Sequence, residues 1–373
     1  MVGIVDTPTE KLKCSSCTIP VAVKKVRRPY PLGEVLLYWH DMKQITSHPL
    51  FWSIALSITA FVAVLFKLGP AALFLVIVLS VLEVTLSFDN AVINARVLER
   101  MSPIWQHRFL TWGILVAVFG TRFVLPIVIV SIAVWTSPWH VTELVFKDPA
   151  EYGRLLDSVH GAIAAFGGIF LLMVSLKYFF NKAKSVHWIK TVEAHLVKWG
   201  RIEAIEIALA LSLLVILSFV TTYDQSQVLV AGIIGLILFV LMEGITGSLS
   251  VESEGVVAGS ASLFLYLEVL DAAFSLDGVV GAFAVTNNLL IIMIGLGVGA
   301  FFVRSLTIYF VERKTLAKLT YLEHGAHWAI LALAISMLLN LVVHIPEVFI
   351  GMIGICVVSV AYYSSIKEAK ARA

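Results

Sequence analysis

Ten long apolar stretches constrain the fold of this chain more than any other feature. They cover residues 51–68, 71–94, 109–134, 160–180, 203–221, 228–249, 258–285, 289–311, 326–343 and 346–364. A helix needs about 20 apolar residues to cross a bilayer, and 59% of this chain is apolar while only 14% is charged. We therefore expect an all-α polytopic membrane protein with about ten transmembrane helices. A soluble enzyme is excluded, and a net charge of +2 offers no basic face for nucleic acid.

The distribution of Lys and Arg predicts the orientation of these spans. With both termini in the cytoplasm, the inner segments carry 22 of these residues and the outer loops carry three. The remaining two, Arg122 and Arg304, lie within spans. This bias agrees with the positive-inside rule, so the basic segment 1–50 and the tail 365–373 are expected in the cytoplasm. The predicted location is the bacterial cytoplasmic membrane.

The chain contains an internal repeat. Residues 81–92 align with 269–280, and an acidic residue, Ser and Asp recur at the same spacing. Three further matches follow in order: Gly113 with Gly295, Arg122 with Arg304, and His160-Gly161-Ala162 with His324-Gly325-Ala326. The copies begin in spans two and seven, so each half, 51–221 and 228–364, holds five helices and the second is inverted. Inverted repeats are typical of secondary transporters, whose substrate site lies near the membrane midplane.

Two segments fall outside the repeat. Residues 181–202 form an insert in the first half whose apolar and basic residues predict an amphipathic helix, either at the membrane interface or as a cytoplasmic linker. The N-terminal segment contains Cys14 and Cys17 in a single CxxC. A structural zinc site needs four ligands, so a metal or redox role for this pair is the minor interpretation.

Charged residues inside the bilayer cost about 2.5–3.5 kcal/mol each and are rarely without a function. The predicted spans contain Glu83, Asp89, Glu243, Glu268, Asp271, Asp277, Arg122 and Arg304. On a straight helix Glu83 and Asp89 are about 120° and 9 Å apart. They therefore belong either to two stacked sites or to a helix broken near Ser87-Phe88-Asp89. We favour broken helices in both copies, since Gly278 and Gly281 follow the second motif.

The side chains around these acids suit a hard cation. Carboxylate, amide and hydroxyl oxygens favour Mg²⁺, Ca²⁺ or Mn²⁺, and four clustered carboxylates must hold a cation or protons. Two alternatives stay open: the arginines form a structural network with the acids, or they bind an anionic or amino-acid substrate. Candidates for supporting the site or carrying protons are Ser87, Asn94, Arg122, His160, Glu243, Glu268, Ser275, Arg304 and His324.

The segment Leu86–Ala91 resembles the Ser-x-Asp-Asn signature of TerC-like integral membrane proteins, a family grouped with the LysE-type transporters. The second copy at Ser275–Gly278 and the segment Tyr321–His327 resemble the long, single-chain branch of that family, although Gly278 stands where the signature has Asn. The family is named for tellurium resistance, and several members are linked to manganese efflux. The resemblance covers about 71–343 and implies metal coordination by Glu83, Asp89, Asn90, Asp271 and Asp277.

Together these features predict a secondary transporter that exports a divalent cation, with Mn²⁺ first, in exchange for protons. The expected partners are the lipid bilayer, the cation and protons. No tightly bound cofactor and no nucleic acid is expected, and a homo-oligomer stays open. Export of Ca²⁺ or an amino acid is the alternative within the transporter class. A non-transporting scaffold for tellurite or stress-resistance proteins is the alternative outside it. An intramembrane aspartyl protease is disfavoured, because Ser275–Gly278 is not Gly-x-Gly-Asp.

Overall fold

The computed structural model describes residues 49–182, 184, 186–252, 256–286, 288–313 and 319–372. Within these ranges the regular structure is helical and contains no strand. The expectations for residues 1–48, including the CxxC of Cys14 and Cys17, lie outside this part of the chain.

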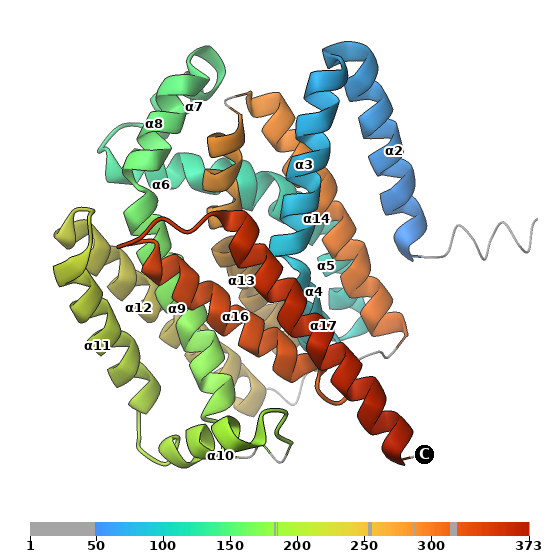
Figure 1. Cartoon of the computed structure of the whole chain (residues 1–373), viewed down its shortest axis with the longest axis vertical. Coiled ribbons are helices and arrows are strands. Elements are labelled where there is room, and N and C mark those ends of the chain that lie inside the picture. The colour runs from blue at the N-terminus through green and yellow to red at the C-terminus, as the bar shows by residue number, and fades with distance from the viewer. Residues whose placement is uncertain are drawn as a thin grey trace, which may run out of the picture. The chain divides into compact units, whose positions relative to one another are not determined.

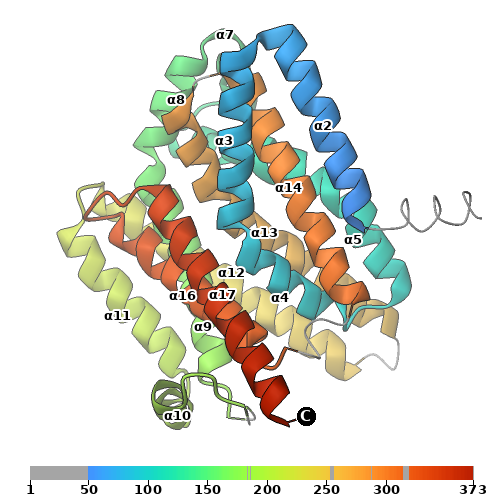
Figure 2. The same cartoon turned by 45° about the vertical axis from the view of Figure 1, so that its right-hand side comes forward.

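The helices follow one another along the chain with short connections (Figures 1 and 2). They are α2 (Pro49–Leu68), α3 (Pro70–Leu86), α4 (Phe88–Leu98), α5 (Pro103–Leu115), the π-helix η1 (Val116–Val124), α6 (Leu125–Ala133), α7 (Pro138–Lys147), α8 (Pro149–Ser158), α9 (His160–Phe179), α10 (Lys190–Trp199), α11 (Ile205–Val220), α12 (Gln225–Glu252), α13 (Val256–Val285), α14 (Leu289–Glu312), α16 (Leu322–Leu339) and α17 (Glu347–Arg372).

The apolar helices confirm a polytopic membrane protein. Six helices in the described ranges are long and apolar enough to cross a bilayer, namely α2, α9, α12, α14, α16 and α17. The number rises to eight if two bent segments each count as one span. One segment consists of α3 and α4, and the other consists of α5 followed by η1 and α6. Neither α11, which has 16 residues, nor the acid-containing α13 is among the eight. The count of ten spans remains a prediction.

The predicted helix break is present in the first copy of the repeat. Ser87 separates α3 from α4 with φ −103° and ψ 11°, and the two helix axes meet at 51°. The corresponding prediction for the second copy is wrong, because α13 runs without interruption through Ser275–Gly278. Glycine within a helix costs only about 1 kcal/mol, and the packing of α13 against α9, α12 and η1 outweighs that cost.

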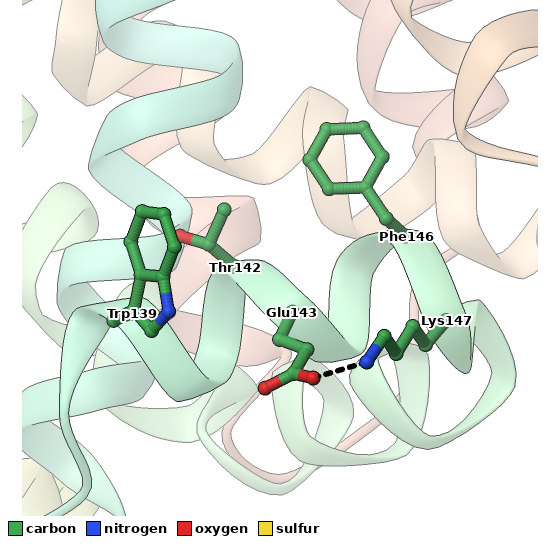
Figure 3. Close-up of a pocket in the computed structure, with 5 residues that line it drawn as sticks. All are labelled: Trp139, Thr142, Glu143, Phe146 and Lys147. Atoms are coloured by element: carbon green, nitrogen blue, oxygen red, sulfur yellow. Dashed lines mark hydrogen bonds and ion pairs between the residues drawn. The ribbon is translucent and has the colours of Figure 1, made fainter.

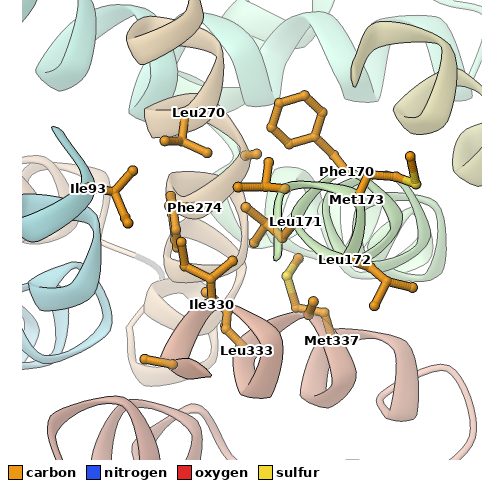
Figure 4. Close-up of a cluster of buried hydrophobic side chains, with 14 of the residues drawn as sticks. Ile93, Phe170, Leu171, Leu172, Met173, Leu270, Phe274, Ile330, Leu333 and Met337 are labelled. Carbon is orange, nitrogen blue, oxygen red and sulfur yellow. The ribbon is translucent and has the colours of Figure 1, made fainter. Parts of the chain in front are cut away.

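The main apolar core surrounds α9. In Figure 4, Phe170–Met173 of α9 lie against Leu270 and Phe274 of α13 and against side chains of α16, with Ile93 of α4 at the edge. α9 also packs along α12, while α3 packs along α14. This core holds α4 and α13 together, and these two helices carry the two acidic motifs of the repeat.

The polar segments gather at two opposite ends of the helix bundle. α7 and α8 lie at one end, and α10 and the C-terminus lie at the other, in both views (Figures 1 and 2). The insert 181–202 therefore contains a real helix, α10, at the same end as the C-terminus.

Candidate functional site

The first buried ion pair joins Glu83 to Arg122. Glu83 lies in the last turn of α3 with 1% of its surface exposed, and Arg122 lies in η1 with 8% exposed. One guanidinium nitrogen of Arg122 donates to Glu83 Oε1, and Ser87 Oγ donates to the same oxygen over 2.9 Å. Ser87, at the break between α3 and α4, thus places its hydroxyl beside the carboxylate of Glu83, which lies one helical turn earlier.

The two copies of the repeat meet directly through Asn90 and Asp271. Asn90 Nδ2 donates to Asp271 Oδ1 over 2.8 Å, and Arg122 Nη1 lies 3.9 Å from Asp271 Oδ2. Asp89, Asn90 and Asp271 are all buried. One arginine of the first copy therefore lies between an acid of its own copy and an acid of the other copy.

A second buried ion pair joins Glu268 of α13 to Arg304 of α14. Arg304 Nη2 donates to Glu268 Oε1 over 3.1 Å, and the guanidinium carbon lies 3.5 Å from the centroid of the Phe109 ring. Gly113 of α5 borders the pair so closely that a Cβ there would collide with the Arg304 guanidinium and lie 2.6 Å from Glu268 Oε1. The lack of a side chain at Gly113 makes room for this ion pair.

The cluster has an excess of buried negative charge and of oxygen atoms without donors. Four carboxylates whose burial the structure shows, those of Glu83, Asp89, Glu268 and Asp271, accompany the two buried guanidinium groups of Arg122 and Arg304, a formal charge of −2 for these six groups. Guanidinium contacts are made by Glu83, Asp271 and Glu268. In the described part of the chain, six buried side-chain oxygens have no hydrogen-bond partner, and five of them belong to α4 and α13: Asn90 Oδ1, Asn94 Oδ1, Glu268 Oε2, Asp271 Oδ2 and Ser275 Oγ. Arg122 Nε and Arg304 Nε also have none there. Buried polar atoms are normally satisfied, so these atoms are the ones available to a ligand or water.

The acids do not converge on a single point in this conformation. Among the residues whose side chains are described, no three His, Cys, Asp or Glu residues lie close enough together to hold a metal ion. Arg122 and Asn90 lie between carboxylates that would otherwise be neighbours. Asp277 lies in α13, and its side chain is outside the described part of the chain.

Three other predicted residues lie apart from these ion pairs. Glu243 of α12 pairs with Lys177, and 42% of its side chain is exposed. His160 begins α9 and is buried, with its ring centroid 6.2 Å from that of Tyr223. His324 lies in the first turn of α16 and has its own carboxylate partner, Glu193.

Glu193 of α10 is a buried acid that the sequence analysis did not identify. It is fully buried, and its carboxylate lies 3.0 Å from His324 Nδ1, 3.0 Å from Trp328 Nε1 and 3.0 Å from Lys184 Nζ. It also accepts hydrogen bonds from the backbone N–H groups of residues 188 and 189. These contacts attach the insert to the start of α16.

The environment of Glu193 favours its ionised form. Burial by itself raises the pKa of this carboxyl, but the hydrogen bonds from His324, Trp328 and Lys184 outweigh burial and hold the pKa well below its usual range. Glu193 is therefore a charged acceptor that binds α10 to α16. The only sequence signal was an acidic residue placed among Trp188, Val192 and Leu196.

A surface pocket lies on α7 and shares no residue with the acid–arginine cluster. Its lining residues Trp139, Thr142, Glu143, Phe146 and Lys147 all come from this one helix, and Lys147 pairs with Glu143 across it (Figure 3). Trp139 and Phe146 are largely exposed. The pocket is thus a feature of one helix face at the end of the bundle.

Comparison with known proteins identifies one family. A family model described as a protein of unknown function (DUF475) matches residues 88–372. No curated protein and no solved structure matches the chain. The matched region includes α4, α13 and α14 but begins after Glu83.

Proposed function

The chain belongs to the DUF475 family, whose function is unknown, and from its own residues we propose that it is a secondary transporter that exports a divalent metal cation. The first candidate is Mn²⁺, moved across the bacterial cytoplasmic membrane in exchange for protons. The proposed cation site consists of the buried residues Glu83, Asp89, Asn90 and Asp271 together with Asp277 of α13. We assign the chain no enzymatic activity.

The observation that carries this proposal is the charge of the cluster. Among the side chains that the structure describes, four buried carboxylates and two arginines leave two negative charges uncompensated, in a region where each charge is costly, and Asp277 is a further acid. A divalent cation or two protons balances two negative charges, and this equivalence is what exchange of one for the other requires. A neutral amino acid carries no net positive charge and a basic one carries a single positive charge, so two uncompensated negative charges favour a divalent metal cation over an amino acid.

The ligand chemistry supports a hard cation. The oxygens of Asn90, Asn94, Asp271, Glu268 and Ser275 without hydrogen-bond partners are the atom types that Mn²⁺, Mg²⁺ and Ca²⁺ prefer. Among these ions, the resemblance to TerC-like proteins favours Mn²⁺. The ion pairs of Arg122 and Arg304 then offset part of the negative charge when the cation is away, and an arginine changes its carboxylate partner when the cation arrives.

We further propose ten spans in two inverted halves, and one pair of reciprocal contacts supports this symmetry. Glu83 corresponds to Asp271 in the repeat, and Asn90 corresponds to Gly278. Asn90 donates to Asp271 of the other copy. A Cβ added at Gly278 would lie 3.5 Å from Glu83 Oε2, so the same two positions also face each other with the copies exchanged.

A second reciprocal contact supports the same two-fold relation. Ser80 corresponds to Glu268, and Gly113 corresponds to Gly295. Ser80 Oγ donates to the carbonyl of Gly295 over 2.9 Å, while Glu268 Oε1 borders Gly113. Each position thus meets the glycine of the opposite copy, as a two-fold axis through the centre of the site requires.

The experiment that tests the proposal is a measurement of cellular manganese by elemental analysis. A manganese-sensitive host expresses the wild type, Asp271→Asn, Asp89→Asn or Asp277→Asn at matched membrane levels. Glu143→Gln, on the exposed surface of α7, is the matched control. We expect the wild type and the control to lower cellular manganese relative to empty vector, and the three cluster variants to lose at least about 90% of this effect.

The same experiment separates the alternatives. If the wild type leaves manganese unchanged, Mn²⁺ export is wrong, and Ca²⁺ content measured in the same samples tests the other cation. A scaffold needs no buried acids. A scaffold would therefore confer the same tellurite or stress resistance on the host in the wild type and in all three cluster variants. Resistance that is unchanged in these variants would reject transport.

A further inference from the structure

We propose that the two arginines of the site have different roles: Arg304 is fixed in place, and Arg122 is a tethered internal cation that the transported metal displaces from Asp271. This inference rests on the proposed function and adds to it which residue competes with the metal. The competing cation is thus part of the chain itself.

Arg304 is held on three sides. Its guanidinium donates to Glu268, lies against the Phe109 ring and borders Gly113, where even a methyl group would collide with it. The ring adds a cation–π contact in a desolvated setting. Only 4% of Arg304 is exposed. Leaving this place would abandon Glu268 as an unpaired buried charge.

Arg122 instead lies between two acids in an unusual helix. It contacts Glu83 directly and Asp271 at 3.9 Å, so it is bound closely to one carboxylate and loosely to the other. Its other nitrogen donates to the carbonyl of Ala117 within η1. Short π-helical segments occur frequently at functional sites. A return of residues 116–124 to α-helical hydrogen bonding would rotate Arg122 relative to α3 and α13.

The reason for the difference is a single substitution between the two copies. Arg122 and Arg304 are equivalent in the repeat, and the position of Ser80 in the first copy is occupied by Glu268 in the second. Glu268 provides Arg304 with a hydrogen-bonded carboxylate partner of its own. The first copy has Ser80 at this position instead of an acid, and the Ser80 hydroxyl is hydrogen-bonded to the carbonyl of Gly295. Arg122 therefore has no equivalent partner there and extends to Glu83 and Asp271.

Displacement of Arg122 would release the carboxylates that a metal needs. Asp271 Oδ2, which has no hydrogen-bond partner in the described residues, would lose its contact with Arg122. Among the described residues, Glu83 would keep only the Ser87 hydroxyl as a side-chain donor. Glu268 is then a positioning residue, since it keeps the second arginine out of the metal site.

The test measures Mn²⁺ binding to the purified full-length protein in detergent by titration calorimetry. Arg122→Gln and Arg304→Gln change the net charge of the cluster equally, so each is the charge-matched control of the other. We expect Arg122→Gln to bind Mn²⁺ about tenfold more tightly than Arg304→Gln, in the range of ordinary coupling between sites. Glu268→Gln/Arg304→Gln keeps the wild-type charge and should bind within about threefold of the wild type.

The outcomes distinguish this inference from the proposed function. Equal tightening by the two single substitutions, or weaker binding by Arg122→Gln, would overturn the assignment of Arg122 while leaving cation binding intact. If no variant binds Mn²⁺, the proposed function and this inference both fail. Should Arg304→Gln fail to fold because Glu268 is left unpaired, Arg122→Lys and Arg304→Lys replace the two single variants, since both keep the wild-type charge: Arg122→Lys must then bind Mn²⁺ more tightly than Arg304→Lys.

Discussion

Individual buried acids in this protein differ in how completely their charge is compensated. Glu193 is surrounded by donors from Lys184, His324 and Trp328, whereas Asp271 has one amide and a distant guanidinium. A carboxylate with a full set of donors stabilises a structure, and one with too few donors is available to a ligand. This contrast separates the attachment of α10 from the proposed cation site.

Replacement of Glu193 should destabilise the protein in a pH-dependent way. Glu193→Gln leaves three donors poorly matched, and we expect a loss of about 3 kcal/mol in unfolding free energy at pH 7. Because the pKa of Glu193 is lowered in the folded state, its contribution is present above the unfolded pKa of about 4.3. It is lost as the pH falls toward the folded value.

Thermal unfolding of the purified protein in detergent between pH 4 and 8 measures this effect. The difference between the wild type and Glu193→Gln should be constant near neutral pH and shrink below about pH 5. Glu143→Gln, which removes an exposed carboxyl, provides the control and should leave stability within about 0.5 kcal/mol of the wild type. A difference that grows on acidification would contradict the charged state of Glu193.

At the scale of helices, the two copies of the repeat have diverged in backbone and in packing. The first motif is broken at Ser87, while the second runs through α13 without a break. Similar local sequences therefore take different backbone conformations. Isolated Ser and Gly residues permit a bend, but the neighbouring helices determine whether it forms.

Gly113 provides a test of helix packing with a predictable sign. Within most helices, Gly→Ala increases stability by about 0.5–1 kcal/mol. At Gly113 the new methyl group would collide with Arg304 and Glu268, so we expect a loss of about 1–3 kcal/mol instead. Gly244→Ala is the matched control, since nothing lies within 4 Å of that position. Chemical unfolding in detergent compares them, and equal stabilisation of both variants would contradict the close contact.

At the scale of the whole molecule, the arrangement of the helices agrees with the charge bias of the sequence. The basic insert with α10 and the C-terminus lie at one end, and α7 and α8, whose basic side chains are Lys147 and Arg154 alone apart from histidine, lie at the other (Figure 1). If the halves are inverted, the segments that precede His160 and His324 face opposite sides of the membrane.

Cysteine labelling in intact cells tests this inversion. Arg154→Cys in α8 and Arg313→Cys after α14 are both exposed positions and precede the two equivalent histidines. In a variant whose native cysteines 14, 17 and 356 are Ser, a membrane-impermeant maleimide should label position 154 and leave position 313 unlabelled until the cells are opened. Labelling of both from outside would reject the inverted repeat.

The sequence by itself determined the class of this protein and the residues of the cluster. Long apolar segments have few alternatives to crossing a membrane, because every backbone polar group in lipid must be bonded within a helix. The same cost made Glu83, Asp89, Asp271, Arg122 and Arg304 recognisable as candidates. Their recurrence at one spacing indicated the repeat, and Ser87 was correctly predicted as a helix break.

Only the tertiary structure decided which charges meet. The sequence offered no means of deciding that Arg304 pairs with Glu268 rather than with Asp271. Such choices depend on distances of a few ångströms between helices far apart in the chain. Glu193 was missed for the same reason. An acid on an amphipathic helix is normally exposed, and it is buried here because α16 supplies His324 and Trp328 as donors.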